Sequence, residues 1–92
     1  MIIVDSLILS QEEQVQNLAI EGAINLLSVQ GEDGKIILYY TRDNLAKNKK
    51  KFTFYIAESK VSASWIIEVR PIYFGSCDLI DASYHIFLTK SN

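Results

Sequence analysis

The side chains that could carry out chemistry are few in this sequence, and they lie near its end. His85 is the one imidazole and Cys77 the one thiol, so a thiol nucleophile with an imidazole base would need both. The thiol and the imidazole would come into contact only if the loop between them folded Cys77 back onto the strand of His85. In addition, no residue is placed to orient the imidazole. Asp78 and Asp81 flank a short apolar pair, which is typical of turn formers. We therefore predict no catalytic residue and no enzymatic activity.

Metal and cofactor sites lack their usual patterns. A zinc site needs three or four ligands at recognisable spacing, and this chain offers one histidine, one cysteine and scattered carboxylates. Its four glycines are separated from one another, so they do not form a phosphate-binding loop. We predict neither a metal nor a cofactor, and we expect the function to be one of binding.

The charges are sorted along the chain. Residues 1–34 hold six acidic side chains and no basic one, whereas residues 35–60 hold seven basic and two acidic ones. The net charge of -2 argues against nucleic acid as a partner, because such binding needs several contacts between cations and phosphates at once. The basic run contains Lys49, Lys50 and Lys51. We interpret it as a solvated loop that also guards a strand edge against pairing with another chain.

Length and composition predict one small domain over residues 1–92, since 49% of the side chains are apolar and no long polar tract interrupts them. A single cysteine excludes an internal disulfide. The apolar run of residues 1–9 is broken by Asp5 and is far shorter than the roughly 20 residues of a membrane span. We expect a strand there, no membrane contact and a cytoplasmic protein. A second copy of the chain would add stability to so small a core.

Strand patterns dominate the C-terminal two thirds. Residues 36–41 are apolar at nearly every position, as in a strand that is covered on both faces. Residues 52–56 and 65–70 alternate, which predicts two strands with their large apolar side chains, Trp65 among them, in the core. Pro71 then marks an edge, a bulge or a strand end, because it has no N–H to donate.

Two further features predict a hairpin and a closing strand. The segment from Gly31 to Gly34 is typical of a hairpin, because glycine and Asp-Gly tolerate the positive φ of a tight turn. Residues 82–89 alternate and place His85 on the less buried of two faces. We expect its imidazole to be structural and to bond to backbone or water.

Residues 11–29 fit two structures. Ser10 and Glu13 have the spacing of a capping box, and apolar residues follow at helical intervals. This pattern predicts an α+β fold with one helix near residues 11–29 packed on an antiparallel sheet. Gly22 at the centre of that helix would cost about 1 kcal/mol relative to alanine, and the residues after it also suit a strand. Periodicity alone leaves both structures open.

Several short segments form a pattern that extends over most of the chain. They are Glu13-Gln14-Val15, Ile20-Glu21-Gly22-Ala23, Leu26-Leu27-Ser28-Val29-Gln30, Lys35-Ile36-Ile37-Leu38-Tyr39, Tyr73-Phe74-Gly75-Ser76 and Tyr84-His85-Ile86-Phe87. This pattern resembles a group of small, largely uncharacterised proteins of phages and prophages. The resemblance implies a compact all-β domain in which residues 23–30 form a strand. We adopt that implication and expect an all-β fold, a small antiparallel sandwich or barrel of about six to seven strands, with α+β as the alternative.

Aromatic side chains exceed what one face of a small core needs, so some should reach the surface. Tyrosine, tryptophan and arginine dominate the energetics of interfaces, and arginine can clamp a carboxylate or a phosphate. The candidate binding residues are Tyr39, Tyr40, Arg42, Lys49, Lys50, Lys51, Tyr55, Trp65, Arg70 and His85.

These observations, with the resemblance, lead us to expect a non-enzymatic protein in the host cell cytosol. It would inhibit a host defence enzyme, for example a CRISPR effector nuclease, by occluding it. One alternative is a sponge for a small nucleotide signal, with Arg42, Arg70 or the lysine run bound to phosphate. Another is a virion or self-assembly accessory protein, a homo-oligomer in which the acidic third of one copy meets the basic third of the next.

Overall fold

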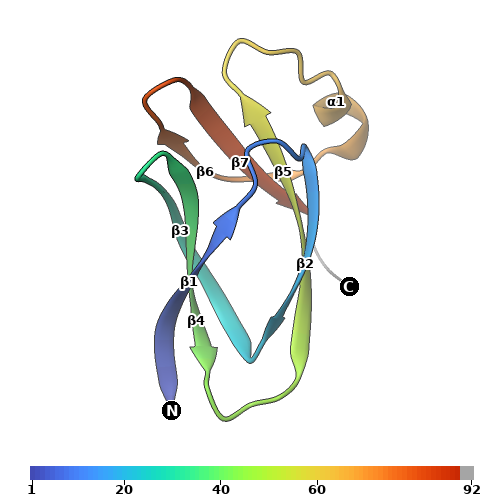
Figure 1. Cartoon of the computed structure of the whole chain (residues 1–92). Coiled ribbons are helices and arrows are strands. Elements are labelled where there is room, and N and C mark those ends of the chain that lie inside the picture. Colours follow the sequence, from blue (N-terminus) through green and yellow to red (C-terminus); the bar gives the residue numbers. More distant parts are fainter. Residues whose placement is uncertain (90–92) are drawn as a thin grey trace.

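Two antiparallel sheets face each other in the computed structural model, which describes residues 1–89 (Figure 1). The three-stranded sheet has the order β1-β4-β3 and consists of β1 (Ile2–Leu9), β4 (Lys35–Asp43) and β3 (Ala23–Glu32). The four-stranded sheet has the order β2-β5-β7-β6 and consists of β2 (Val15–Glu21), β5 (Lys49–Glu58), β7 (Ser83–Thr89) and β6 (Ile72–Asp78). The predicted all-β fold is therefore confirmed.

The core lies between the two sheets, because alternate side chains of each strand point inward. The largest fully buried side chains come from both sheets and are Phe54, Leu9, Ile36, Leu38 and Ile86. The predicted inward face of residues 52–56 is confirmed. Residues 36–41 are buried on one face only, since their outer side chains remain partly exposed.

Residues 11–29 form strands and not the alternative helix. β2 ends at Glu21, and Gly22 turns the chain into β3 with a φ of +71°. β3 contains two register shifts against β4, between Ala23 and Asn25 and between Leu26 and Ser28. Such bulges break the strict alternation of a strand, which is why the apolar residues of this segment imitate helical spacing.

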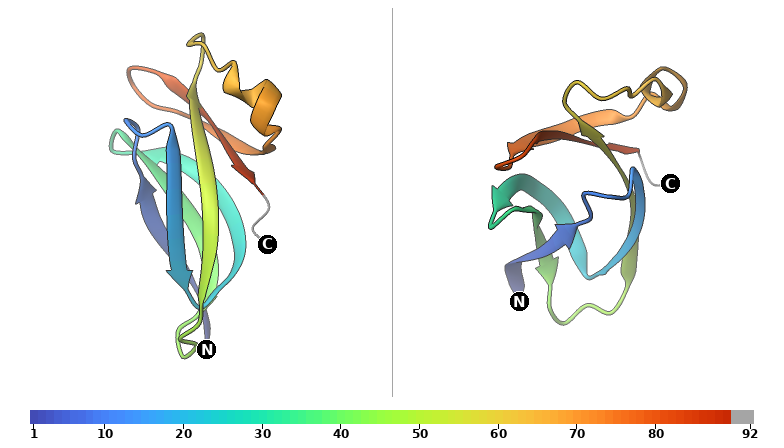
Figure 2. Two further views of the ribbon diagram at one scale, coloured as in Figure 1. Left: turned by 90° about the vertical axis from the view of Figure 1, so that its right-hand side faces the viewer. Right: turned by 45° about the horizontal axis from the view of Figure 1, so that its top comes forward.

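The strand predicted for residues 65–70 is wrong. The segment forms the short helix α1 (Trp65–Val69), which Arg70 ends in the left-handed conformation with a φ of 51°. Ile67, expected in the core, is 77% exposed. The physical reason is the strand order: β7 lies between β5 and β6, so the connection from β5 to β6 has to pass outside the sheet. Figure 2 shows α1 on that outer side.

The other turn predictions have mixed outcomes. The Gly31 to Gly34 segment forms the β3 to β4 hairpin, with positive φ at Asp33 and Gly34. The lysine run is only partly a loop, because Lys49 to Lys51 begin β5 and pair with β2. Pairing of β5 with β7 begins at Thr53, so among residues 1–89 no strand pairs with these lysines on that side, which agrees with the predicted guard of a strand edge.

Candidate binding surface

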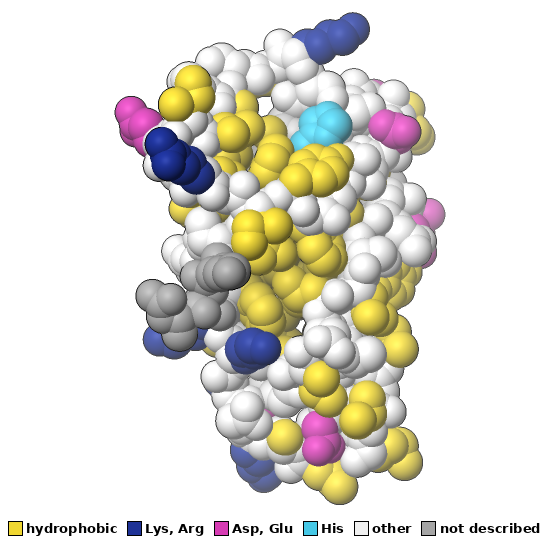
Figure 3. Space-filling model, turned by 180° about the vertical axis from the view of Figure 1, so that it is seen from behind, with side chains coloured by type: hydrophobic (Ala, Val, Ile, Leu, Met, Phe, Trp, Pro, Cys, Tyr) yellow, Lys and Arg dark blue, Asp and Glu magenta, His cyan; other side chains and the backbone are white. Residues whose placement is uncertain are grey.

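Four aromatic rings and one imidazole gather on the outer face of the four-stranded sheet. The strands contribute all but one of them, and α1, which lies on the outer side of this sheet, contributes a tryptophan. We call this set the aromatic face, and it consists of Tyr55 on β5, His85 and Phe87 on β7, Tyr73 on β6 and Trp65 on α1. Figure 3 shows apolar side chains around the imidazole, with charged side chains at the margins.

Ring contacts hold the aromatic face together. Strand register puts Phe87 between Tyr55 on one side and Tyr73 on the other. The Trp65 ring stacks on Tyr55 at 5.2 Å between centroids and meets Phe87 edge-on at 6.0 Å. Tyr73 also meets Phe87 edge-on, at 5.2 Å. Stacked and edge-on pairs each add about 0.5–1.5 kcal/mol beyond the burial of their area, so the rings hold one another in place.

His85 is fixed within the aromatic face by two hydroxyl groups. Its Nε2 lies 2.9 Å from the Ser59 Oγ and its Nδ1 lies 3.1 Å from the Tyr73 hydroxyl. The imidazole is thus on the predicted less buried face, and the partners that the structure shows are two side-chain hydroxyl groups. In serine hydrolases a carboxylate orients the imidazole, whereas a phenol occupies that position here. This arrangement orients the ring within the face.

Cys77 lies on the opposite side of the sheet from His85. It is buried in the core from β6, where it pairs with Tyr84, the neighbour of His85 in β7. Neighbouring residues of a strand point to opposite faces, so the thiol and the imidazole are kept apart. Burial raises the pKa of the Cys77 thiol, which disfavours the reactive thiolate.

The indole N–H of Trp65 has no hydrogen-bond partner although it is buried. Among residues 1–89 it is the one buried side-chain nitrogen or oxygen in that condition. A buried donor left unpaired costs about 1–3 kcal/mol. The ring contacts of Trp65 with Tyr55 and Phe87 must offset this cost.

The structure separates the remaining predicted binding residues from this face. Tyr40 is 6% exposed and packs in the core, so its side chain offers little surface to a partner. Tyr39 lies in the other sheet, where its hydroxyl donates to Glu32, and this contact raises the pKa of Tyr39. Arg42 is bound to Asp5 in that sheet, so it does not meet Arg70, which follows α1.

The three lysines lie toward the other end of β5. Lys51 lines a hollow of about 370 Å³ together with residues of β2, among them Asn17 and Ala19. The Lys50 ammonium lies 5.8 Å from the centre of the Phe52 ring. Lys49 pairs in register with Glu21. The lysine run lies near Arg42, because Arg42 and Lys51 line two hollows that share Ala19 of β2. The nucleotide sponge stays a prediction.

Three of the predicted residues, Tyr55, Trp65 and His85, do come together. Tyr73 and Phe87 complete the aromatic face, although the sequence analysis selected neither as a candidate binding residue. Phe87 could have been selected, because alternation in residues 82–89 puts it on the same face as His85. Tyr73 could not, because only the pairing of β6 with β7 places it there.

Comparisons of the chain with protein-family models, with curated proteins and with solved structures find no match. Within the described residues 1–89, no group of three or more histidine, cysteine or acidic side chains could hold a metal ion. No helix in that same range is both long and apolar enough to cross a membrane.

The ion pair between Asp5 and Arg42 should make stability depend on pH. Arg42 Nε lies 2.8 Å from the Asp5 carboxylate, and this bond, followed by the Ser6 N–H, lowers the pKa of Asp5 below its ordinary value of 3.8. A carboxyl whose pKa is lower in the folded state stabilises it above the unfolded pKa. That contribution is lost as the pH falls through the folded pKa.

Asp5→Asn is therefore expected to lower the free energy of unfolding at pH 7. The difference from the wild type should shrink as the pH falls below 3.8. Urea unfolding from pH 7 to pH 2.5 measures it, and Glu13→Gln, at an exposed carboxylate, controls for net charge. A difference that is constant over this pH range would contradict the prediction.

Proposed function

We propose that the protein is a non-enzymatic binding protein that docks another protein through the aromatic face. One observation carries the proposal: the aromatic face lies outside the core, which other side chains fill. Tyr73 on β6 is 52% exposed, whereas Phe54 on β5 and Ile86 on β7, which point to the other face of the same sheet, are fully buried. Large aromatic rings that the core does not use are typical of interface residues that contribute most of the binding energy.

The geometry favours tight binding because little has to be ordered when a partner arrives. Trp65, Phe87 and Tyr73 are already in contact through their rings, and two hydroxyl groups hold His85. Side chains that are ordered before binding lose less conformational entropy on association.

The resemblance to phage and prophage proteins supports a host enzyme as the partner. A defence nuclease, such as a CRISPR effector in the host cytosol, is the first class to test. A chain that acts by covering its target inhibits in proportion to the amount bound. Inhibition is therefore expected to reach completion at a fixed ratio of the two proteins.

Tyr73→Ala is expected to weaken binding to such a nuclease by about 2 kcal/mol or more, which is about thirtyfold in Kd. The matched control is Tyr39→Ala, a tyrosine on the outer face of the other sheet, which should bind as the wild type does. Calorimetry measures Kd and stoichiometry, and nuclease assays measure inhibition. Trp65 is the one tryptophan, so its fluorescence reports contact at the aromatic face.

Two outcomes would contradict the proposal. Equal Kd values for the two tyrosine variants would exclude the aromatic face as the interface. Inhibition of many nuclease molecules by one molecule of this protein would exclude occlusion and indicate catalysis.

A further inference from the structure

β1 forms an open edge that lacks the usual protection. It pairs with β4 from Ile2 to Leu9 without a register shift, and no strand formed by residues 1–89 lies on its other side. β3, at the opposite edge of the same sheet, contains two register shifts and lies beside β6. Lysine, proline and bulges are the common means of blocking an exposed edge. β1 contains none of the three over its eight residues.

Two hydrogen bonds show which main-chain groups of β1 face the open edge. The Met1 carbonyl accepts from the Asn44 N–H at 3.0 Å, on the β4 side. The Ser6 N–H donates to the Asp5 carboxylate at 2.8 Å, and so it does not point to β4. In an antiparallel pair, neighbouring residues direct their main-chain groups to alternate sides. The N–H and C=O groups of Ile2, Val4, Ser6 and Ile8 therefore face outward.

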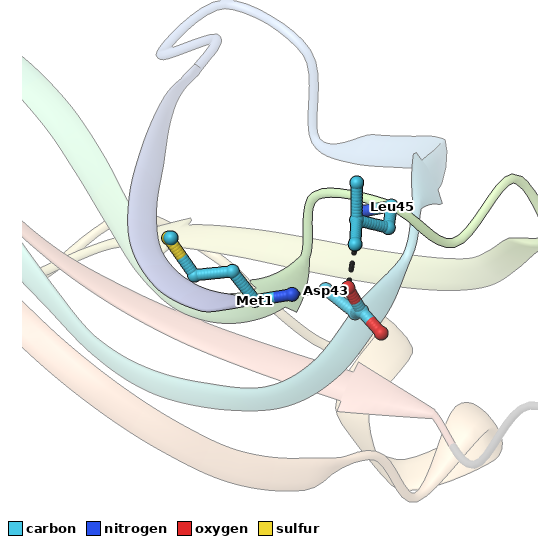
Figure 4. Close-up of polar contacts among 3 residues, drawn as sticks. All are labelled: Met1, Asp43 and Leu45. Atoms are coloured by element: carbon cyan, nitrogen blue, oxygen red, sulfur yellow. Dashed lines mark hydrogen bonds and ion pairs between the residues drawn. The ribbon is translucent and has the colours of Figure 1, made fainter.

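The start of β1 is held in place for such a contact. The Met1 amine lies 3.2 Å from the Asp43 carboxylate. The same carboxylate accepts the N–H of Leu45 at 3.0 Å (Figure 4). These bonds fix the first residues of β1 against the end of β4, so the edge is ordered from its beginning.

The side chains at the open edge are mainly aliphatic. Ile2, Val4 and Ile8 are 66%, 63% and 58% exposed on the outer face of the sheet. Asp5 is the only charged residue of β1, and its carboxylate is bound to Arg42. A strand that approached this edge would thus meet apolar side chains and free main-chain groups.

We propose that β1 is a dimerisation edge, at which two copies of the chain pair antiparallel about a two-fold axis at Val4. The two three-stranded sheets then become one sheet of six strands. In this register Val4 faces Val4 of the partner subunit, and Ile2 faces Ser6 of the partner subunit. Each of these residues gains main-chain hydrogen bonds, and the Ser6 N–H exchanges the Asp5 carboxylate for a main-chain carbonyl.

A second copy is the occupant that fits the sequence of β1 about this axis without opposing like charges. Asp5 faces Ile3 of the partner subunit in this register, so the two carboxylates do not lie opposite each other. Antiparallel pairing of identical strands closes on itself and leaves no further β1 edge free. It also removes part of the exposed apolar surface of Ile2 and Val4 from water, which stabilises the dimer. This inference goes beyond the proposed function, because β1 and the aromatic face belong to different sheets.

Val4→Lys should dissociate the dimer, since it places two ammonium groups together at the two-fold axis. The matched control is Ile8→Lys, a similarly exposed residue of the same strand that lies outside the paired segment. Light scattering and sedimentation over a concentration series should give twice the 10.4 kDa chain mass for the wild type and for Ile8→Lys. The dimer dissociation constant of Val4→Lys should rise at least tenfold, with an unchanged circular dichroism spectrum.

The remaining outcomes overturn the proposal. A wild-type monomer at all concentrations would do so, and so would equal dissociation of both lysine variants. Association that 1 M salt abolishes would indicate contact between the acidic and basic thirds instead, because exposed ion pairs are screened.

Cross-linking tests the register itself. Hydrogen-bonded residues of antiparallel strands have Cα atoms about 5.5 Å apart, which suits a disulfide. Val4→Cys should therefore form a covalent dimer on oxidation, whereas Ile8→Cys should not. The buried Cys77 leaves the result interpretable. Equal cross-linking of both variants would exclude the two-fold axis at Val4.

Discussion

Replacing Gly22 with alanine is expected to lower the free energy of unfolding by about 3 kcal/mol or more, enough to unfold much of the protein. Gly22 has a φ of +71°, where a side chain costs about 1–2 kcal/mol. A methyl group there would also overlap the carbonyl oxygen of Asp43. The backbone cannot move away freely, because the Gly22 N–H donates to Asn48 and its carbonyl accepts from Asp43.

Gly34→Ala is the matched control for this prediction. Gly34 has nearly the same φ, +72°, but nothing lies within 4 Å of the position that its methyl group would occupy. It should therefore lose only the about 1–2 kcal/mol of the left-handed conformation. Urea unfolding of both variants measures the difference. Equal losses would show that the contact with Asp43 relaxes at little cost.

Phe54→Ala is expected to cost about 3–5 kcal/mol of stability, the range for large buried side chains. Phe54 is fully buried in the internal strand β5, between two neighbouring strands that cannot collapse into the space. The cavity would lie at the centre of the core, next to the ring of Phe52. The variant should be partly unfolded at 37 °C.

Phe87→Ala on the neighbouring strand is the comparison for Phe54→Ala. Phe87 lies on the outer face and is only partly buried, so its removal should cost less than half as much stability. It should nevertheless weaken binding at the aromatic face, because both Trp65 and Tyr73 pack against its ring. Thermal unfolding combined with partner binding separates the two effects. A stability loss as large as that of Phe54→Ala would place Phe87 in the core.

The two proposed contact surfaces are compatible with each other. The aromatic face belongs to the four-stranded sheet, and the dimerisation edge belongs to the three-stranded sheet. A dimer through β1 would carry two aromatic faces, and a partner with two binding sites would be held more tightly by both. Val4→Lys is therefore expected to leave the intrinsic affinity of one face unchanged while it removes this second attachment.

Alternation along single strands predicted the parts of the fold that depend only on local sequence. It placed Phe54 and Ile86 inside and His85 outside, because the side-chain period of two is a property of one strand. The glycine hairpin before β4 was likewise predictable, since the positive φ at Gly34 is a local requirement. Periodicity did not distinguish helix from strand over residues 11–29, because the bulges of β3 imitate helical spacing. The strand over residues 23–30 was expected only from the resemblance to phage and prophage proteins.

The tertiary structure alone decided the site. Strand order sends the connection from β5 to β6 across the outside of the sheet, so Trp65 lies on Tyr55 and not in the core. The pairing of β6 with β7 brings Tyr73 to His85. Tyr40 entered the core because the two sheets close over its face of β4. A sequence pattern reports which face of its own element a residue occupies, but which elements become neighbours depends on contacts between segments far apart in the chain.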